Sequence, residues 1–444
     1  MTERRSEVII VGGGVTGTAL LWVLSRFTNV NDILLIEKNS GVAQVNSHPL
    51  NNAQTSHDGG TETNYDLPHA LEVKKAATIL RNYIESRKKK GLFKKTHRMV
   101  LGVGRREVET LRKRYAEFKD AYPDLSLVGP KKLEALEPLV MKNRDPRQAV
   151  CALFSTEGYA IDYQKLSESF LEDALETRKE IKVLFDTAVR SIRRENGEYV
   201  LGATKGTFRA PVIVFAAGPY SLLFAQELGY GKEYAILPVA GSFFSGGELV
   251  RGKVYRVQIP GRPFAEIHAD ADVLNQKDTR FGPTTKPLPL MERHQYKSFF
   301  DFVKLPLISI RGLWALLKIL SSNGLLSYVA KNACYDLLPF LGKLMFLREA
   351  RVIIPSIKYR DLKRRKGAGG IRPQIVNLET GNLEMGDATI VGENCIFNTT
   401  PSPGASKAPA NAKRDAMRVV GFLGKKYYFD QEAFELELEA PRTP

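Results

Sequence analysis

The amino-terminal forty residues show two short apolar runs on either side of a longer helical pattern. Residues 8–11 (VIIV) are all apolar and β-branched, which is typical of a parallel strand that is buried on both faces. Residues 18–24 (TALLWVL) predict a helix, and residues 33–36 (ILLI) predict a second buried strand. The order strand, helix, strand indicates a βαβ unit of an α/β protein with a parallel sheet.

A glycine motif lies between the first predicted strand and the helix. Gly12, Gly14 and Gly17 form a G-x-G-x-x-G pattern. The first glycine makes the tight turn, the second lets backbone amides approach a pyrophosphate, and the third lets helix and strand pack closely. Glu37 ends the second strand, where a carboxylate can bind ribose hydroxyls and where an acid argues against NADP. The complete pattern predicts a dinucleotide site for NAD or FAD.

The rest of the chain does not continue as the regular βαβ repeats of a nicotinamide dehydrogenase. A second glycine-rich stretch at residues 102–104 lacks the third glycine and precedes charged residues, so it predicts no second dinucleotide site. Another apolar strand is predicted at residues 212–215, and it ends in the small residues 216–218 (AAG). Small residues at a strand end indicate that a ligand or a helix approaches the backbone closely.

Composition places the chain among ordinary globular proteins, with about two to three domains. It has 444 residues, 43% hydrophobic and 26% charged, which excludes a collagen, a coiled coil and a disordered chain. Cys151, Cys334 and Cys395 lie far apart with no histidine at ligand spacing, so no disulfide framework, zinc site or iron–sulfur cluster is predicted. No stretch reaches about 18 uncharged apolar residues, and only a short polar segment precedes the first strand. We therefore expect no membrane-spanning helix and no secretory signal.

Motifs spread along most of the chain resemble one family of flavin enzymes. Together with the glycine motif and residues 216–218, they look like a FAD domain of the glutathione reductase type, in the branch whose second domain binds an organic substrate. They are similar to the malate:quinone oxidoreductases, especially the shorter members, and more distantly to the L-2-hydroxyglutarate oxidases. The resemblance extends from about residue 8 to about residue 423. Its motifs are 51–59 (NNAQTSHDG), 62–65 (ETNY), 237–243 (LPVAGSF), 263–270 (PFAEIHAD), 280–283 (RFGP), 371–374 (IRPQ) and 400–405 (TPSPGA).

This resemblance implies an α/β fold in which a discontinuous, glutathione-reductase-type FAD-binding Rossmann domain is combined with a second, α+β substrate domain. We expect residues 1–95, 151–235 and 367–444 to form the FAD domain, the last segment including a C-terminal tail. We expect residues 96–150 and 236–366 to form the substrate domain, with a mixed or antiparallel sheet and helices.

The resemblance also implies FAD as the cofactor and a set of residues that contact it. A helix is predicted over residues 408–423, and its N-terminus would face the flavin pyrimidine, where its dipole stabilises the anionic reduced flavin. Lys407 and Ala408 depart from the family pattern, in which small hydroxyl residues are expected at these positions. The predicted cofactor-binding residues are Gly12, Gly14, Gly17, Glu37, Lys38, Gln54, Thr55, Val189, Ala217, Gly218, Pro403, Gly404 and Ala405.

Two histidines are candidates for the acid–base chemistry. Oxidation of a 2-hydroxy acid requires that hydride leave the α-carbon and that a base take the hydroxyl proton, and imidazole suits this task at neutral pH. Of six histidines, His57 lies in a polar stretch and His268 follows the strand-like residues 264–267 (FAEI). The resemblance places both near flavin and substrate, and it leaves open which of them takes the proton. The other four are expected to be surface or structural residues.

A dicarboxylate substrate also requires a fixed cation. The planar guanidinium of arginine binds a carboxylate through two hydrogen bonds. Arg372 stands between a glycine-rich stretch at 367–370 and a proline, and the motif makes it our candidate for the substrate carboxylate. Arg280 is a weaker candidate, because an alternating strand through residues 279–281 would direct its side chain to solvent.

The charge pattern suits an anionic membrane surface. The 65 basic and 49 acidic residues give a net charge of +16, and residues 87–98 contain seven lysines and arginines without an acid. A second basic cluster lies at 363–366 (KRRK), and both suit anionic headgroups, nucleic acid, a dicarboxylate or merely a solvated face. Residues 305–320 predict either a basic amphipathic helix at a bilayer interface or a core helix. We expect peripheral attachment at the cytoplasmic side of the membrane and no nucleic-acid partner.

The sequence thus predicts an FAD-dependent dehydrogenase that oxidises (S)-malate to oxaloacetate and reduces a membrane quinone. No metal cluster or haem motif is visible, so electrons must pass from the flavin directly to quinone or to oxygen. An L-2-hydroxyglutarate oxidase or dehydrogenase is the nearest alternative, because its substrate differs by one methylene. Flavin enzymes that modify tRNA would need a reactive cysteine or a folate site, and a binding protein without chemistry would have no use for the histidines and Arg372.

Overall fold

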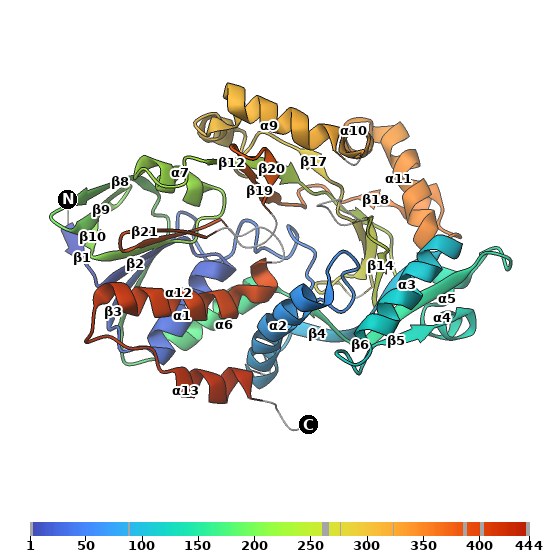
Figure 1. Ribbon diagram of the computed structural model, residues 1–444, viewed down its shortest axis with the longest axis horizontal. Coiled ribbons are helices and arrows are strands. Elements are labelled where there is room, and N and C mark those ends of the chain that lie inside the picture. Colours follow the sequence, from blue (N-terminus) through green and yellow to red (C-terminus); the bar gives the residue numbers. More distant parts are fainter. Residues whose placement is uncertain are drawn as a thin grey trace.

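A six-stranded sheet forms the core of the half of the molecule that carries the amino terminus (Figure 1). The computed structural model describes residues 3–87, 89–259, 266–275, 277–322, 324–384, 389–399 and 404–440. The strand order in this sheet is β21-β22-β11-β2-β3-β7, and only β21 is antiparallel to its neighbour. Its strands are β2 (Val8–Val11), β3 (Asp32–Ile36), β7 (Glu180–Leu184), β11 (Val212–Phe215), β21 (Thr389–Gly392) and β22 (Cys395–Asn398). The predicted strands are confirmed, and the strand at 212–215 lies directly beside the first one.

Both faces of this sheet are covered, which explains why its strands are apolar throughout. Val8 and Ile10 pack on one face against the helices α1, α6 and α12, whereas Ile9 and Val11 pack on the other against a second sheet. The helices are α1 (Val15–Phe27), α6 (Tyr163–Leu175) and α12 (Ala408–Leu423). The second sheet has the order β1-β10-β9-β8, with β1 (Glu3–Arg5), β8 (Val189–Glu195), β9 (Glu198–Ala203) and β10 (Gly206–Ala210). The helix predicted over residues 408–423 is confirmed.

A larger, eight-stranded sheet forms the opposite half of the molecule. Alternate residues of one strand face opposite layers, because Met99 and Leu101 pack against α11 (Pro339–Ile353) and Val100 packs against α3 (Arg105–Phe118). The strand order is β18-β13-β16-β15-β14-β4-β6-β5. The strands are β4 (Phe93–Val103), β5 (Ser126–Val128), β6 (Val150–Ile161), β13 (Phe244–Ser245), β14 (Lys253–Arg256), β15 (His268–Ala271), β16 (Thr279–Gly282) and β18 (Lys363–Arg364).

A small sheet bridges the two halves and is covered on its outer side by helices. Its order is β17-β12-β19-β20, with β12 (Tyr234–Ala240), β17 (Lys286–Pro287), β19 (Ile371–Asn377) and β20 (Asn382–Leu383). Ile236 and Ile375 of this sheet share a core with Ala315 of α9 (Ile310–Ser321) and Leu325 of α10 (Leu325–Leu337). Figure 1 shows α9, α10 and α11 in succession along one edge of the molecule. The other described helical segments are α2 (Leu67–Arg87), α4 (Pro130–Leu136), α5 (Pro138–Met141), α7 (Tyr220–Glu227), α8 (Phe299–Phe302) and α13 (Gln431–Phe434).

The strand pairing qualifies the predicted domain boundaries. The boundaries at 95/96 and 150/151 fall inside β4 and β6, and these two strands pair with each other in the eight-stranded sheet. Likewise β12 and β19, which were predicted to belong to different domains, are antiparallel partners over their whole length. The division into five segments stays a prediction, because the small sheet contains strands from the predicted FAD domain and from the predicted substrate domain.

Candidate active site

A cavity of about 720 Å³ runs from the carboxyl ends of the parallel strands to the small bridging sheet. At one end it is lined by the glycine motif and by Glu37, and at the other by Val239 and Arg372 of paired strands β12 and β19. Ligands of open α/β sheets bind outside the carboxyl ends of the strands, so this is the expected place for a dinucleotide. Most of the predicted cofactor-binding residues line it: Gly12, Gly14, Glu37, Lys38, Gln54, Thr55, Val189, Ala217, Gly218, Gly404 and Ala405.

The three glycines of the motif have separate physical roles. A Cβ on Gly12 would collide with the carbonyl of Ala216, and one on Gly17 would collide with the carbonyl of Gly12. These two glycines therefore allow the strand, the turn and α1 to pack, and Gly17 does not itself line the cavity. A Cβ on Gly14 would meet only the hydroxyl of Ser47, at 3.5 Å, so the backbone there faces open space at the helix N-terminus. This cradle fits a pyrophosphate group.

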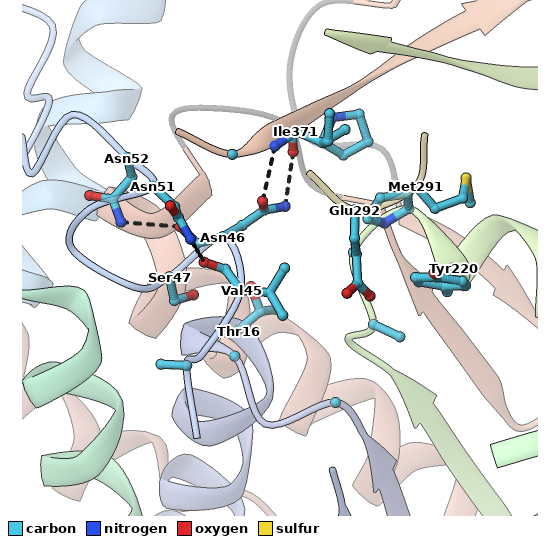
Figure 2. A pocket seen from close by; sticks show the side chains of 18 of the residues that line it. Thr16, Val45, Asn46, Ser47, Asn51, Asn52, Tyr220, Met291, Glu292 and Ile371 are labelled. Atoms are coloured by element: carbon cyan, nitrogen blue, oxygen red, sulfur yellow. Dashed lines mark hydrogen bonds between the residues drawn. The ribbon is translucent and has the colours of Figure 1, made fainter. Parts of the chain in front are cut away.

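Glu37 stabilises the turn of the glycine motif and lines the same end of the cavity. Its Oε2 accepts a hydrogen bond of 2.6 Å from the backbone N–H of Gly13, and its Oε1 accepts one of 2.8 Å from that of Asn39. Lys38 forms an ion pair with Glu292 and lies 4.5 Å from the centre of the Tyr220 ring. Burial lowers the pKa of Lys38 and outweighs the opposing charge of Glu37. Figure 2 shows Glu292 and Tyr220 on the same side of the cavity.

The start of α12 supplies a hydroxyl group that sequence reasoning placed one residue too late. The segment Gly404–Lys407 forms a 3₁₀ turn before α12, and Gly404, Ala405 and Ser406 line the cavity. Ser406 Oγ accepts a hydrogen bond of 3.0 Å from the backbone N–H of His57. The small hydroxyl residue expected at 407–408 is therefore present at 406. Pro403, the remaining predicted cofactor residue, lies outside the described residues.

A loop over residues 43–57 connects the dinucleotide end of the cavity to the bridging sheet. The amide of Asn46 forms two hydrogen bonds with the backbone of Ile371, of 2.9 Å to its carbonyl and 3.2 Å from its N–H (Figure 2). The side chain of Gln54 is 1% exposed and donates to Asp272 Oδ1 at 3.0 Å. The loop therefore fixes the first residue of β19, directly before Arg372.

The structure corrects the expectation for Arg280. Its side chain was predicted to face solvent if it missed the substrate, but the residue is 2% exposed. The guanidinium donates to the carbonyls of Asn52 and Pro49, at 2.5 and 3.3 Å, and lies over the ring of Phe243. Burial lowers the pKa of Arg280 to about 10. Since Arg280 supports the cavity loop from behind and does not line the cavity, we assign it no substrate contact.

His57 lines the cavity and is paired with a buried carboxylate. His57 Nδ1 lies 2.6 Å from Glu62 Oε1. Burial would raise the pKa of Glu62, but the hydrogen bond and charge of His57 and the charge of Arg98 lower it to about 2. Glu62 is therefore ionised at neutral pH and can only accept a hydrogen bond, which places the proton of a neutral His57 on Nδ1. The other ring nitrogen, Nε2, is then free to take a proton.

Arg372 brings a positive charge to the same cavity. Among the residues that the structure describes, its guanidinium has no hydrogen-bond or ion-pair partner, and burial lowers its pKa. The phenol groups of Tyr65 and Tyr328 lie close enough to act on it electrostatically. Tyr65 also closes a turn on Glu62, since its N–H donates to the Glu62 carbonyl at 3.1 Å. This turn connects the carboxylate beside His57 with the phenol near Arg372.

His268 occupies a different position from the one that the motif predicted. It is the first residue of β15, is 3% exposed and does not line the cavity. Its Nδ1 lies 2.8 Å from Asp270 Oδ2, and its ring lies 5.0 Å from that of Tyr255. The Tyr255 hydroxyl is 3.1 Å from Thr55 Oγ1, which does line the cavity. His268 therefore reaches the cavity wall only through Tyr255 and Thr55.

Sequence reasoning missed several residues of the site. Glu62 and Tyr65 lie within a quoted motif, and an acid five residues after a candidate base was the available signal for Glu62. Asn46 and Tyr328 gave none, because their roles depend on contacts with Ile371 and Arg372, which lie in a different element of the fold. Within the described ranges, no group of three or more His, Cys, Asp or Glu side chains is placed to hold a metal ion.

The fold and the cavity define a protein with a Rossmann-type dinucleotide domain, joined by a small sheet to a second domain. Solved structures of this architecture include L-α-glycerophosphate oxidase from Mycoplasma pneumoniae with FAD bound, with a TM-score of 0.62, 18% identity and coverage of 96% of each chain. Glycine oxidase from Geobacillus kaustophilus has a TM-score of 0.63 and 18% identity, covering 97% of this chain and 98% of its own. At this identity the likeness shows the fold alone.

Sequence comparison gives the family. A sequence model of malate:quinone oxidoreductase matches residues 4–414. The chain is 35% identical to a probable malate:quinone oxidoreductase of Campylobacter jejuni, over 99% of this chain and 100% of the relative. It is also 35% identical to the malate:quinone oxidoreductase of Helicobacter pylori strain 26695, over 97% of this chain and 96% of the relative. The chain belongs to the malate:quinone oxidoreductase family.

Proposed function

We propose that this protein oxidises (S)-malate to oxaloacetate with FAD as the cofactor and passes the electrons to a membrane quinone. The family and its full-length relatives support the substrate and the acceptor. The cavity supports the cofactor, because the space in front of Gly14 and the carboxylate of Glu37 suit a pyrophosphate and a ribose.

One observation supports the reaction above all others: Arg372 and His57 line one cavity. Arg372 has no hydrogen-bond or ion-pair partner among the described residues, and the partner of His57, Glu62, is ionised. A 2-hydroxy acid offers a carboxylate to Arg372 and a hydroxyl to His57. Arg372 is half-buried, and a half-buried guanidinium without a counter-charge among the described residues is costly to a folded protein, so an anionic ligand there would stabilise it.

The residues of the chain then divide the work. FAD, when bound, supplies the acceptor for the hydride that leaves the α-carbon of malate. Arg372 binds a carboxylate of the substrate through its planar fork and fixes its orientation. His57 Nε2 takes the proton of the substrate hydroxyl, and the carboxylate of Glu62 stabilises the imidazolium that forms. One hydride and one proton leave the alcohol, which becomes the ketone of oxaloacetate.

Two of the three cysteines argue against the tRNA-modification alternative. Cys151 and Cys395 are buried, and burial raises the pKa of both thiols, which disfavours the nucleophilic thiolate. The distinction between malate and 2-hydroxyglutarate rests on the family, because a pocket that excludes one methylene changes selectivity by only ~1–3 kcal/mol.

Anaerobic titration of the purified flavoprotein tests the proposal. Malate should bleach the visible flavin band, whereas 2-hydroxyglutarate and lactate, each added alone, should not. Replacement of Arg372 by Gln should retain the flavin and lower kcat/KM for malate by about 100-fold or more, because charged hydrogen bonds to a carboxylate are lost. The matched control is Arg106→Gln, an exposed arginine of α3, which should behave as the wild type.

A protein that binds no flavin, or a flavin that none of the three acids reduces, would overturn the proposal. Bleaching by 2-hydroxyglutarate but not by malate would instead establish the neighbouring substrate for the same chemistry.

A further inference from the structure

The exposed apolar side chains of this protein are concentrated in one part of the chain. Fifteen of the twenty-two large hydrophobic residues that are exposed in the described ranges lie between residues 296 and 344. Ten of them belong to α9, α10, α11 and the turn between the last two helices, and we call them the α9–α11 face. They are Ile310, Leu313, Trp314, Leu317, Leu326, Leu337, Leu338, Phe340, Leu341 and Leu344. Exposed large apolar side chains that are concentrated in this way usually mark an interaction site.

Each helix of this face has one side that packs on the protein and one that does not. In α9, Ala315 and Ile319 are buried against the bridging sheet, whereas Leu313 is 49% and Leu317 is 70% exposed. α9 therefore contributes one side to the core and leaves the other side, with Ile310 and Trp314 as well, exposed. Figure 1 shows these helices at the outer edge of the molecule, with no other element beyond them.

The charges of this face suit an anionic surface. Residues 310–353 contain six lysines and arginines and only two acids. Asp336 is buried and paired with Lys286 and Arg364, and Glu349 is paired with Arg256 and Lys331. Arg311, Lys318 and Arg348 are exposed, so among the described residues the charge offered to solvent here is positive.

The basic clusters that the sequence singled out are less suited to this role. In the first cluster Arg87 pairs with Asp173, Lys89 with Glu172, Lys95 with Glu157 and Arg98 with Asp58. In the second cluster, Arg364 pairs with Asp336 and Arg365 with Asp272. Lys88 lies outside the described residues. These cations mostly neutralise acids of the protein itself.

The same helices form the wall behind the candidate substrate site. The hydroxyl of Tyr328, on the inner side of α10, lies 3.3 Å from Thr285 Oγ1, and Thr285 lines the cavity. Tyr328 also lies close enough to Arg372 to affect its pKa. Leu326, two residues earlier on α10, is 61% exposed. The thickness of one helix therefore separates the α9–α11 face from the cavity.

We propose that the α9–α11 face lies on an anionic phospholipid bilayer, with its apolar side chains among the acyl chains and its basic side chains at the headgroups. This position would let a lipid-soluble quinone approach the cavity from the membrane, a consequence that rests on the proposed function. Among the described residues, no single helix is long and apolar enough to cross a membrane. Only α9 and α10 together pass that test, and they are bent by 91°. Two short helices with this bend can both lie along a membrane surface.

Vesicle binding tests the face directly. The full-length flavoprotein is sedimented with vesicles of phosphatidylcholine and phosphatidylglycerol, and with vesicles of phosphatidylcholine alone. The double variant Leu313→Glu/Leu317→Glu should bind the mixed vesicles at least tenfold more weakly. The control Leu175→Glu/Leu436→Glu removes two apolar side chains of similar exposure, 51% and 76%, from other parts of the surface and should bind as the wild type. Lys89→Glu should also have little effect.

Tryptophan fluorescence provides a measurement that does not depend on destabilising substitutions. The chain has two tryptophans, of which Trp22 is 0% and Trp314 is 50% exposed. Vesicles made with brominated lipids should quench the emission of Trp314, and the quenching should disappear in Trp314→Phe. Equal binding of both double variants, or vesicle binding without quenching, would overturn the proposal. So would an apolar face that is buried between two copies of the chain, seen as a dimer in sedimentation velocity that the Glu variant dissociates.

The two proposals fail in different ways. With malate as the electron donor, the Leu313→Glu/Leu317→Glu variant should reduce a water-soluble quinone at the wild-type rate. It should reduce a long-chain quinone dissolved in the vesicles at least fivefold more slowly than the wild type does. If the wild-type protein reduces neither quinone with malate but still binds the vesicles, the proposed function is wrong and the membrane-binding proposal is retained. If the variant reduces both quinones as fast as the wild type does, the membrane-binding proposal is wrong and the proposed function is retained.

Discussion

Two histidine–carboxylate pairs lie on either side of the same cavity wall, and they differ in access. His57 faces the cavity beside Glu62, with 23% of its side chain exposed. His268 lies behind the wall beside Asp270, with 4% of its side chain exposed. Between them lies Thr55, whose hydroxyl contacts Tyr255 and accepts a hydrogen bond of 2.9 Å from the buried Lys253.

The carboxylates of the two pairs are electrostatically alike. Burial would raise the pKa of Asp270, but the charges of His268 and Lys253 lower it to about 2, the value that Glu62 also has. Both acids are therefore ionised at neutral pH. Since a general base must come within hydrogen-bond reach of the proton that it takes, position and not charge separates the roles of the two histidines. We infer that His57 is the base and that His268 supports the wall.

Replacing each histidine by glutamine should separate the roles of His57 and His268 by the largest effect. His57→Gln should retain FAD and reduce the rate of flavin reduction by malate by about 100- to 10,000-fold, because a general base is lost. His268→Gln should slow the same step by less than about tenfold. Anaerobic stopped-flow absorbance at saturating malate measures both, and flavin content controls for folding. If the His268 variant is the slower of the two, the assignment is reversed.

A substitution of Asp270 tests whether the pair of His268 and Asp270 stabilises the fold. Asp270→Asn would remove the carboxylate that lies 3.6 Å from the buried Nζ of Lys253, so it should destabilise the protein by about 3–5 kcal/mol at pH 7. The folded-state pKa of Asp270, about 2, lies below its ordinary value of 3.8. Its ionisation therefore contributes roughly 2 kcal/mol above about pH 4, and this contribution is lost as the pH falls toward 2.

Urea unfolding of the wild type and of Asp270→Asn at a series of pH values measures this effect. The difference in unfolding free energy between the two should shrink as the pH is lowered below about 4. A difference that is independent of pH would show that the carboxylate acts by packing rather than by charge. As a comparison, Asp145→Asn removes an exposed acid and should change the stability by less than about 0.5 kcal/mol.

The two ends of the cavity differ in how much of each could be predicted from the sequence. The dinucleotide end is built from contiguous residues, so the strands at 8–11 and 33–36 and the turn at Gly12 could be placed from pattern alone. The substrate end is assembled from the loop at 43–57 and from β19 and α10, which lie hundreds of residues further along the chain than that loop. No local pattern records which of these segments meet.

His268 illustrates the limit of a motif most clearly. Motif and residue type were the same kind of support for His57 and His268, but they carry no information about which face of a strand a side chain occupies. The strand begins at His268 itself, and its pairing with Gly282 directs the imidazole toward Tyr255 and Asp270 rather than into the cavity. Only the register of β15 could have shown this.

Glu62 allows a finer test of the cavity pair. Glu62→Gln keeps the shape of the side chain but removes the charge that stabilises the imidazolium, so flavin reduction should slow by about 10- to 100-fold. Anaerobic stopped-flow absorbance at saturating malate measures this rate, and flavin content controls for folding. An unchanged rate would mean that Glu62 acts only by position.

Replacing Asn46 should give the smallest change in catalysis, and it tests how Arg372 is held in the cavity. Asn46→Ala removes two hydrogen bonds to Ile371, worth about 1 kcal/mol each, and should loosen β19 next to Arg372. We expect KM for malate to rise by about tenfold while kcat changes little, because His57 and Glu62 are untouched. The matched control is Asn51→Ala, since the Asn51 amide donates to the carbonyl of Val45, at 2.8 Å, and to no other group among the described residues. Equal changes in KM for both variants would show that the loop as a whole, rather than its connection to β19, positions Arg372.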